Sequence, residues 1–335
     1  MSRRVLVTGG AGFVGSHAVR ALLERGYAVE IVDDLSEGHR EAVPRDVALH
    51  VYDIADRGRM DALLGARRFD GVLHFAARCY VGESVREPGA YYRANVARTV
   101  ELLEALRAAK VTAFVFSSSC ATYGDPVRTP MDEEHPQRPI NPYGRSKLFV
   151  EQILADYARA HGLRSACLRY FNAAGAHASG SIGEHHDPET HLIPLAIQAA
   201  QGLKPGLQVF GDDYPTRDGT CVRDYVHVSD LAEAHLLALE AITAHEPGQR
   251  AWNLGTGVGS SVREVIRTVE EVSGLRVPFR IAPRRLGDPP ELVADGSRAA
   301  RELGWKPRYA SLRAVVETAW AWHRSHPRGY SEGLR

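Results

Sequence analysis

Tyr143 and Lys147 have the types and spacing of a general base and its supporting cation. Four residues apart in a predicted helix, they share one face with Cβ atoms about 6 Å apart. A phenol with a pKa of about 10 is a poor base at neutral pH, and a neighbouring ammonium favours its ionised form. Oriented by Ser119, the phenol could then take a proton from a hydroxyl group. The same spacing also arises by chance on surface helices, so the surrounding elements must decide.

Those residues belong to an alternation of short β-branched runs with helical stretches, which is typical of a parallel α/β sheet. The pattern predicts a doubly wound Rossmann sheet of six strands, at 4–8, 28–32, 48–52, 72–75, 113–116 and 165–170. Helices are predicted at 13–25, 57–65, 89–110 and 143–161.

Beyond about residue 172, glycine and proline separate shorter elements. We therefore expect a nucleotide-binding domain over 1–172 and a smaller, loop-rich C-terminal α/β substrate domain over 173–335. Some later segments, such as a helix near 229–242, are expected to return to the first domain.

A glycine-rich loop joins the first predicted strand to the first helix. Gly9, Gly12 and Gly15 form G-x-x-G-x-x-G, which lets the backbone approach a pyrophosphate that faces the helix N-terminus. A glycine triplet alone fits a tight turn without a ligand equally well. Its place between a strand and a helix favours a bound dinucleotide.

Asp33 ends the second predicted strand, about 20 residues beyond the glycine loop, where a carboxylate can accept both hydroxyls of an adenosine ribose and repels a 2′-phosphate. This favours NAD over NADP. Two alternatives stay open, because Asp33 and Asp34 could form a solvated turn and Arg40 could recognise a phosphate.

Asp53 and Ile54 follow the third predicted strand and are a candidate adenine contact, or else an ordinary strand end. If NAD⁺ is bound, its positive nicotinamide ring would join Lys147 in lowering the pKa of Tyr143 toward the working range.

Composition argues against several functional classes. The 335 residues include 41 Lys plus Arg and 41 Asp plus Glu, a net charge of zero. Such a chain has no broad positive field for capturing a polyphosphate, so nucleic acid is not an expected partner. No run approaches the roughly 18 consecutive apolar residues that span a bilayer, and the N-terminus lacks a signal-peptide pattern. We expect no membrane association and a cytoplasmic location.

The four cysteines are far apart in sequence and form no C-x-x-C. This pattern suits reduced thiols in a reducing compartment. It does not suggest zinc, and no metal is expected.

Longer motifs carry a resemblance over nearly the whole chain: VTGGAGFVGSH at 7–17, HFAA at 74–77, VGESV at 81–85, SSS at 117–119, NPYGRSK at 141–147 and LRYFN at 168–172. With these the sequence resembles the extended short-chain dehydrogenase/reductase family. Three more specific motifs resemble the substrate domain of its nucleotide-sugar 4-epimerases: GDDYPTRDGTCVRDYVH at 211–227, NLGTG at 253–257 and APRRLGD at 282–288.

The resemblance implies that the protein interconverts UDP-galactose and UDP-glucose by NAD-dependent oxidation and re-reduction at sugar C4. Tyr143 would take the proton of the 4-hydroxyl, with Ser119 bonded to the same oxygen. The 4-keto sugar would turn its other face to the nicotinamide before hydride returns, so that NAD is retained rather than consumed. It also implies a homodimer formed by the helices near 89–110 and 143–161.

The resemblance further implies site residues that spacing alone does not indicate. Arg223 and Arg285 would anchor the diphosphate with planar, bidentate cations, and Asp288 would hold the uridine ribose. The implied cofactor contacts are Phe13, Val14, Phe75, Ala76, Ala77, Ser117, Tyr143, Lys147 and Tyr170. The other implied substrate contacts are Asn172, His191, Leu192, Gln208, Phe210 and Leu292.

Three positions depart from the family pattern. Cys79 stands where many members carry a lysine near the cofactor phosphates, which predicts weaker cofactor retention. His191 replaces an Asn near the diphosphate. Leu292 stands where some members have Tyr beside the sugar 2-position, so UDP-GalNAc and UDP-GlcNAc are candidate substrates, with simple repacking as the alternative.

Other functions compete with this one. Another UDP-sugar 4-epimerase, such as one for UDP-arabinose, would use the same elements. A 4,6-dehydratase needs an adjacent Asp and Glu where this chain has Cys120 and Ala121, which argues against it. A non-catalytic NAD-binding module is disfavoured by the intact Ser119, Tyr143 and Lys147.

Overall fold

The computed structural model describes residues 3–285 and 287–330. Its main layer is a seven-stranded parallel sheet in the order β10-β6-β5-β4-β1-β2-β3. The strands are β1 (Arg4–Thr8), β2 (Ala28–Asp33), β3 (Ala48–Val51), β4 (Gly71–His74), β5 (Ala113–Ser117), β6 (Arg164–Tyr170) and β10 (Gly248–Leu254). The predicted doubly wound α/β fold is confirmed. The strand order changes direction between β1 and β4, where ligands bind in such sheets.

The prediction of six strands was wrong by one. The seventh, β10, begins with the partly polar run Gly248-Gln249-Arg250 and lies at the sheet edge beside β6. An edge strand need not be apolar throughout, so its sequence lacks the continuous β-branched run that identified the other six.

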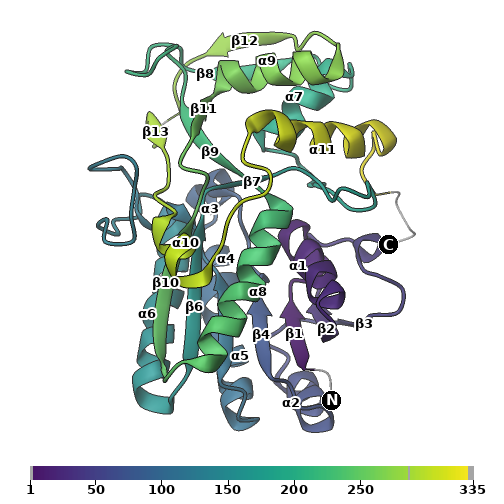
Figure 1. Cartoon of the computed structure of the whole chain (residues 1–335), viewed down its shortest axis with the longest axis vertical. Coiled ribbons are helices and arrows are strands. Elements are labelled where there is room, and N and C mark those ends of the chain that lie inside the picture. Colours follow the sequence, from purple (N-terminus) through teal and green to yellow (C-terminus); the bar gives the residue numbers. More distant parts are fainter. Residues whose placement is uncertain (1–2, 286, 331–335) are drawn as a thin grey trace.

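Helices cover both faces of this sheet and enclose two cores. On one face lie α1 (Phe13–Glu24), α8 (Val228–Ala244) and α10 (Ser297–Leu303), packed around residues such as Leu22, Ile31 and Leu236. Figure 1 shows α1 and α8 side by side in front of the strands. On the other face lie α2 (Arg57–Ala66), α5 (Arg98–Ala108) and α6 (Pro142–His161), around Leu102 and Phe114. Two elements beyond residue 172 therefore belong with the larger sheet: β10 is one of its strands, and α8 packs on its face.

The helix predicted over 89–110 is divided into α4 (Pro88–Tyr91), a π-helical turn η2 (Tyr92–Ala97) and α5. π-Helical turns are rare in proteins, and those that occur are frequently found at functional sites. Here it carries Asn95, whose side chain bonds to Arg78 and Ser146 on neighbouring segments. These contacts, which the helical pattern cannot show, accompany the wider turn.

A smaller part lies above the sheet in Figure 1. It contains a four-stranded sheet of β7 (Asn172–Ala174), β9 (Val222–His227), β11 (Gly259–Ser261) and β13 (Glu291–Leu292), and the parallel pair β8 (Leu207–Phe210) and β12 (Phe279–Ala282). A third core, with Ile193, Val265 and Val316, joins α7 (Leu192–Ala200), α9 (Val262–Ser273) and α11 (Leu312–Ser325). Short helices α3 (Val81–Arg86), η1 (Arg40–Ala42) and η3 (Cys120–Thr122) complete the elements.

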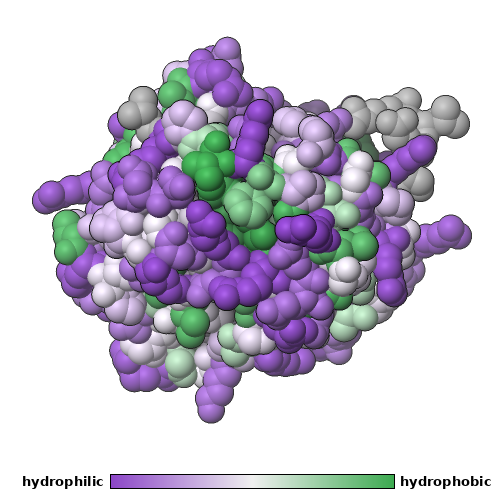
Figure 2. Space-filling model, turned by 90° about the horizontal axis from the view of Figure 1, so that it is seen from above, coloured by the Kyte–Doolittle hydropathy of each residue, from purple (hydrophilic) through white to green (hydrophobic). Residues whose placement is uncertain are grey.

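The surface agrees with the even charge balance. Seen from the end that carries β8 and β12, hydrophilic side chains cover most of the face and surround a small hydrophobic group near its centre (Figure 2). Among residues 3–285 and 287–330, no helix has the length and apolar character needed to cross a bilayer.

Candidate active site

The beginning of α6 brings Tyr143 to the end of β5. Asn141 caps the helix by accepting a hydrogen bond from the Gly144 N–H at 2.8 Å, and Pro142 occupies the first turn. Gly144 is required by packing, because a Cβ there would collide with the carbonyl oxygen of Ala121 in η3. This close approach places the phenol of Tyr143 within reach of a hydrogen bond with Ser119.

Lys147 lies one helical turn further along α6, on the same side of the helix. Its ammonium donates to the carbonyl oxygen of Ser117 at 2.8 Å and lies 5.8 Å from the centre of the Tyr143 ring. The side chain is buried, and this burial lowers the pKa of Lys147 to about 8. The hydroxyl of Ser117 in turn donates to the Tyr170 oxygen at 3.0 Å. The predicted Ser, Tyr and Lys set is therefore assembled in one place.

The expected lowering of the Tyr143 pKa involves Lys147 together with bound NAD⁺, and in the protein alone the pKa shifts the other way. Burial raises the pKa of Tyr143 well above its ordinary value, and only the hydrogen bond with Ser119 opposes it appreciably. The phenolate loses its water shell, while the ammonium of Lys147 is directed to the Ser117 carbonyl rather than to the phenol oxygen. A further positive charge beside Tyr143 would be needed to make it a base at neutral pH.

The glycine loop forms a narrow cradle at the N-terminus of α1. Gly9 has a φ of +74°, and a Cβ there would clash with the backbone of Ala76. At Gly15 a Cβ would collide with the Gly9 carbonyl oxygen. Beside Gly12 the space is open, with the Gly9 oxygen, at 3.4 Å, as the nearest described atom to a Cβ placed there. This shape suits a pyrophosphate placed against the helix end.

Asp33 is fixed at the adjacent strand end. Its two carboxylate oxygens accept hydrogen bonds from the N–H groups of Ala11 and Leu35, both at 2.9 Å. Burial raises the pKa of Asp33, and these two bonds oppose the rise. Each oxygen keeps a lone pair free to accept a ribose hydroxyl. The buried carboxylate and the cradle together fit NAD.

Arg98, which the sequence analysis did not single out, lies next to this position. Its guanidinium forms ion pairs with Asp53 at 2.9 Å and with Asp34 at 3.7 Å. The side chain of Ile54 is buried in the second core. A nucleotide could therefore contact position 54 chiefly through its backbone.

The remaining predicted cofactor contacts surround the cradle. The N–H groups of Phe75 and Ala76 both donate to the Thr8 carbonyl, which ties the segment after β4 to the end of β1. Ala77 follows in the same segment. Phe13 and Val14 open α1, and the Phe13 ring lies 5.4 Å from that of His17 in an edge-on contact.

In the smaller part of the molecule, four predicted substrate residues form one group. Arg285 donates from Nε to Asp288 at 2.8 Å, and its guanidinium lies 4.7 Å from the centre of the Phe210 ring. Arg223, from β9, lies 3.7 Å from the same carboxylate and donates to the Pro289 carbonyl at 2.9 Å. An aromatic face, two guanidiniums and a carboxylate are suited to a nucleoside diphosphate.

Four other predicted substrate positions lie outside that group, although Leu292 of β13 pairs in register with Arg223 of β9. Leu292 packs against a small core that contains Phe171, and Cys120, next to Ser119, packs against the same core. Asn172 begins β7 and pairs in register with Tyr225 of β9. Leu192 packs against the third core, and Gln208 is exposed on β8.

His191 caps α7 and is held by two acidic side chains, with its Nδ1 atom 3.0 Å from an oxygen of both Glu184 and Glu189. Burial alone would lower the pKa of His191, but these carboxylates raise it well above its usual value.

Comparison with known proteins agrees with this geometry. Residues 5–255 match the sequence profile of the NAD dependent epimerase/dehydratase family. A UDP-glucose 4-epimerase from Rhizobium meliloti is 52% identical over 331 residues, which cover 98% of this chain and 99% of that protein. The chain belongs to the NAD dependent epimerase/dehydratase family.

Solved structures of the NAD dependent epimerase/dehydratase fold align over nearly the full length. The UDP-glucose 4-epimerase of Brucella ovis in complex with NAD gives a TM-score of 0.92 at 50% identity, covering 95% of this chain and 98% of that one. A UDP-glucose 4-epimerase from Stenotrophomonas maltophila, with bound NAD and formylated UDP-arabinopyranose, gives 0.94 at 47% identity over 97% and 99%.

Sequence reasoning missed Asn95, which positions this epimerase/dehydratase site. Its carbonyl oxygen accepts from the Arg78 N–H at 2.8 Å, and its amide donates to Ser146 Oγ at 2.9 Å. It thus ties the segment that carries Cys79 to α6. A polar residue in an otherwise packed helical stretch was the available signal.

A buried ion pair links the segment next to Ser119 with α6 and β6. Arg169 and Glu151 lie 2.6 Å apart, and Ser118 donates to Glu151 at 2.6 Å. Because its members come from three distant segments, no spacing in the sequence could have indicated this network.

Cys79, where the family resemblance leads one to expect a lysine, lies on the segment that Asn95 ties to α6. Burial of the sulfur raises the pKa of the Cys79 thiol, and the charges of His191 and Lys147 oppose this rise. Arg78 does not replace the missing cation, because its guanidinium pairs with Glu83 at 2.7 Å.

Proposed function

We propose that this chain interconverts UDP-galactose and UDP-glucose by oxidation and re-reduction at C4, with NAD as its cofactor. The observation that carries this function is the Ser119, Tyr143 and Lys147 set at the carboxyl end of β5, on the same edge of the parallel sheet as the glycine cradle. The cradle fits a dinucleotide, and the group around Arg285 fits a nucleoside diphosphate; we call the space assigned to these two ligands the candidate cleft.

In the proposed mechanism, Ser119 and Tyr143 bind the sugar 4-hydroxyl, and Tyr143 takes its proton. NAD⁺, when bound, supplies the acceptor for the C4 hydride and, once reduced, its donor, so no net oxidation occurs. The raised pKa of Tyr143 in the protein alone means that it becomes a base chiefly beside the positive oxidised cofactor. Tyr143 returns its proton to the 4-oxygen when the ketone is reduced from its other face.

We assign Arg223, Arg285 and Asp288 the task of holding the nucleotide while the sugar rotates. Their charges already lie together, so substrate need only replace contacts among side chains. Gly12, Asp33 and the segment of Phe75 to Ala77 are assigned to the cofactor, and Lys147 positions it beside Tyr143.

The direct test is proton NMR of UDP-galactose with purified protein and no added NAD. Conversion to UDP-glucose alone supports 4-epimerisation with a retained cofactor. If conversion begins only after NAD⁺ is added, the function stands and the Cys79 position accounts for loose retention. A 6-deoxy-4-keto product, or no conversion with NAD⁺ present, contradicts it, and turnover of UDP-arabinose alone would assign a pentose epimerase instead.

The acceptance of N-acetyl sugars rests on Leu292, which packs, like Cys120, against the small core that contains Phe171. A Leu292→Tyr variant should lower turnover of UDP-GlcNAc relative to UDP-glucose because the larger ring fills the space. An unchanged ratio of the two activities would remove this proposal.

A homodimer is proposed through α6 and the helices beside it. Phe149 is exposed on α6 and stacks with Tyr92 of η2 at 5.9 Å, an aromatic pair suited to an interface. Light scattering at micromolar concentration should give twice the chain mass, and a monomeric mass would contradict it. A cytoplasmic location stays a prediction, with which the four free thiols agree.

A further inference from the structure

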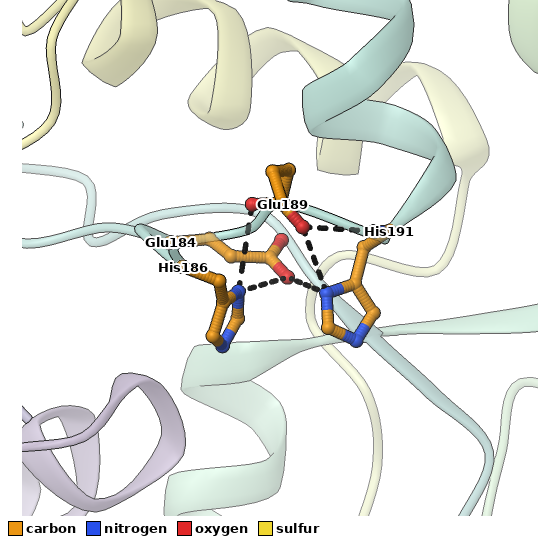
Figure 3. A group of neighbouring side chains, drawn as sticks. All are labelled: Glu184, His186, Glu189 and His191. Carbon is orange, nitrogen blue, oxygen red and sulfur yellow. Dashed lines mark hydrogen bonds and ion pairs between the residues drawn. The ribbon is translucent and has the colours of Figure 1, made fainter. Parts of the chain in front are cut away.

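Four side chains just before α7 converge on one point. Glu184, His186, Glu189 and His191 follow the pattern E-x-H-x-x-E-x-H, and one donor atom from each lies within 4.8 Å of all the others. Figure 3 shows the Glu184 carboxylate between the two imidazole rings, with both Nδ1 atoms directed to it. We call this group the His/Glu cluster.

The four nitrogen–oxygen separations in the cluster are close to the edges of a small coordination polyhedron, and the four donor atoms all lie within 4.8 Å of one another. His191 Nδ1 lies 3.0 Å from Glu184 Oε1 and from Glu189 Oε1, and His186 Nδ1 lies 3.5 Å from Glu184 Oε1 and 3.4 Å from Glu189 Oε2. Donor atoms around a tetrahedral ion with bonds of about 2.0 Å lie roughly 3.3 Å apart. A cation could therefore enter the His/Glu cluster with only small shifts of its side chains.

Burial leaves the two carboxylates of the cluster with only its histidines as ion-pair partners in the described part of the chain. The side chains of Glu184 and Glu189 are each 3% exposed, and that of His186 is 12% exposed. Among residues 3–285 and 287–330, no Lys or Arg forms an ion pair with either carboxylate. Two buried carboxylates without such a partner are costly unless a cation neutralises them.

His186 provides a second, independent observation. Its Nδ1 atom is buried and forms no hydrogen bond in the described structure, and the carboxylate oxygens that it faces lie 3.5 and 3.4 Å away, beyond the usual hydrogen-bond distance (Figure 3). Buried polar atoms are rarely left unpaired, and an absent ion is one of the usual reasons. A metal bond to this nitrogen would satisfy it.

We propose that Glu184, His186, Glu189 and His191 bind one divalent transition-metal ion, with Zn²⁺ as the best match. Imidazole ligands favour such ions over Mg²⁺ and Ca²⁺, and four protein ligands describe a closed, structural site. The proposal departs from the expectation of no metal, which rested on the cysteine pattern alone.

The ion would fasten the segment 184–191 beside the cofactor cradle. The His186 ring lies 6.3 Å from that of Phe13, at the start of α1, and 6.0 Å from that of Tyr80. His191, when bound through Nδ1, keeps Nε2 on the far side of its ring for another contact (Figure 3). The metal would thus fix the orientation of this segment and of His191 toward the candidate cleft. This proposal does not depend on the proposed function.

The test measures metal directly. Untagged protein is treated with chelator, incubated with Zn²⁺ or Co²⁺, desalted and analysed by mass spectrometry for metal content. We expect one ion per chain, and visible d–d bands of tetrahedral Co²⁺. His186→Gln and Glu184→Gln should each weaken binding at least tenfold. His185→Gln, the adjacent histidine outside the cluster, and His245→Gln, an exposed one, are the matched controls and should keep it.

Thermal unfolding gives a second readout that does not depend on catalysis. Zn²⁺ should raise the Tm of the wild-type chain and of both controls, but not that of Glu184→Gln. If His186→Gln fails to fold, Glu189→Gln takes its place. Substoichiometric metal in the wild-type chain, or equal binding by cluster variants and controls, would overturn the proposal and leave protonated histidines to balance the carboxylates.

Discussion

The two sides of the candidate cleft are built differently. On the side of the seven-stranded sheet, Lys147 and Asp33 are buried, Lys147 held by a backbone carbonyl at the end of β5 and Asp33 by a backbone N–H of the glycine loop. On the side of the smaller part, the Arg285 side chain is 59% exposed and is held by Asp288, three residues further on. The first side therefore presents preorganised groups, whereas the second presents side chains that can exchange one partner for another. The chemical step needs groups that are already held in position, whereas binding of the nucleotide tolerates side chains that exchange partners.

The largest effect should follow from removing the base on the rigid side. Tyr143→Phe keeps the ring but removes the proton acceptor, so kcat for UDP-galactose should fall by about 10²–10⁴-fold, with little change in substrate affinity. Tyr157→Phe is the matched control, because Tyr157 lies on the same helix and bonds to Glu104 instead. Activity of Tyr143→Phe near that of the control would show that the phenol is not the base.

The next effect concerns the fixed carboxylate beside the glycine loop. Asp33→Asn removes the charged acceptor of the ribose hydroxyls, which costs about 2–3 kcal/mol and weakens NAD⁺ binding by roughly thirtyfold to hundredfold. Calorimetric titration of cofactor-free protein measures this directly. The neighbouring exposed Asp34→Asn should bind NAD⁺ nearly as the wild type does, and similar losses in both variants would contradict the assignment.

The buried histidines of the sheet side should make its fold sensitive to acid. Burial lowers the pKa of His17 and of His74 to about 3. The unfolded chain takes up these protons from pH 6.5 downward while the folded chain does not, so the free energy of unfolding falls as pH drops below 6.5. Each of these two histidines should lower the free energy of unfolding by about 2 kcal/mol between pH 7 and pH 5.

Chemical denaturation at pH 7 and pH 5 tests this expectation. His74→Gln should show a smaller difference between the two pH values than the wild type, whereas the exposed His245→Gln should match it. Equal pH dependence in all three proteins would mean that His74 is not protected from protonation.

The smallest effect is expected in the smaller part of the molecule, where Arg285 is exposed. Arg285→Lys keeps the charge but loses the planar fork, so KM for UDP-galactose should rise about tenfold while kcat changes little. Arg284→Lys is the control, since Arg284 pairs with Asp213 instead. A loss confined to kcat would mean that Arg285 acts in the chemical step, and the contrast between the two sides would fail.

The sequence by itself determined most of the sheet side. Strands such as 4–8 and helices such as 143–161 were predicted within a residue or two, because apolar periodicity and capping residues act between near neighbours. The glycine loop, Asp33 and the Tyr143 and Lys147 pair are local patterns as well. The edge strand β10 and the π turn at 92–97 were missed because distant segments decide them.

Tertiary structure alone decided the rest, because burial and long-range pairing have no local signature. Spacing could not show that Arg98 contacts Asp53, or that Glu151 pairs with Arg169. The direction of the Tyr143 pKa depends on desolvation, which a sequence does not contain. The His/Glu cluster lies within eight consecutive residues, yet only the folded segment turns its four side chains to one point.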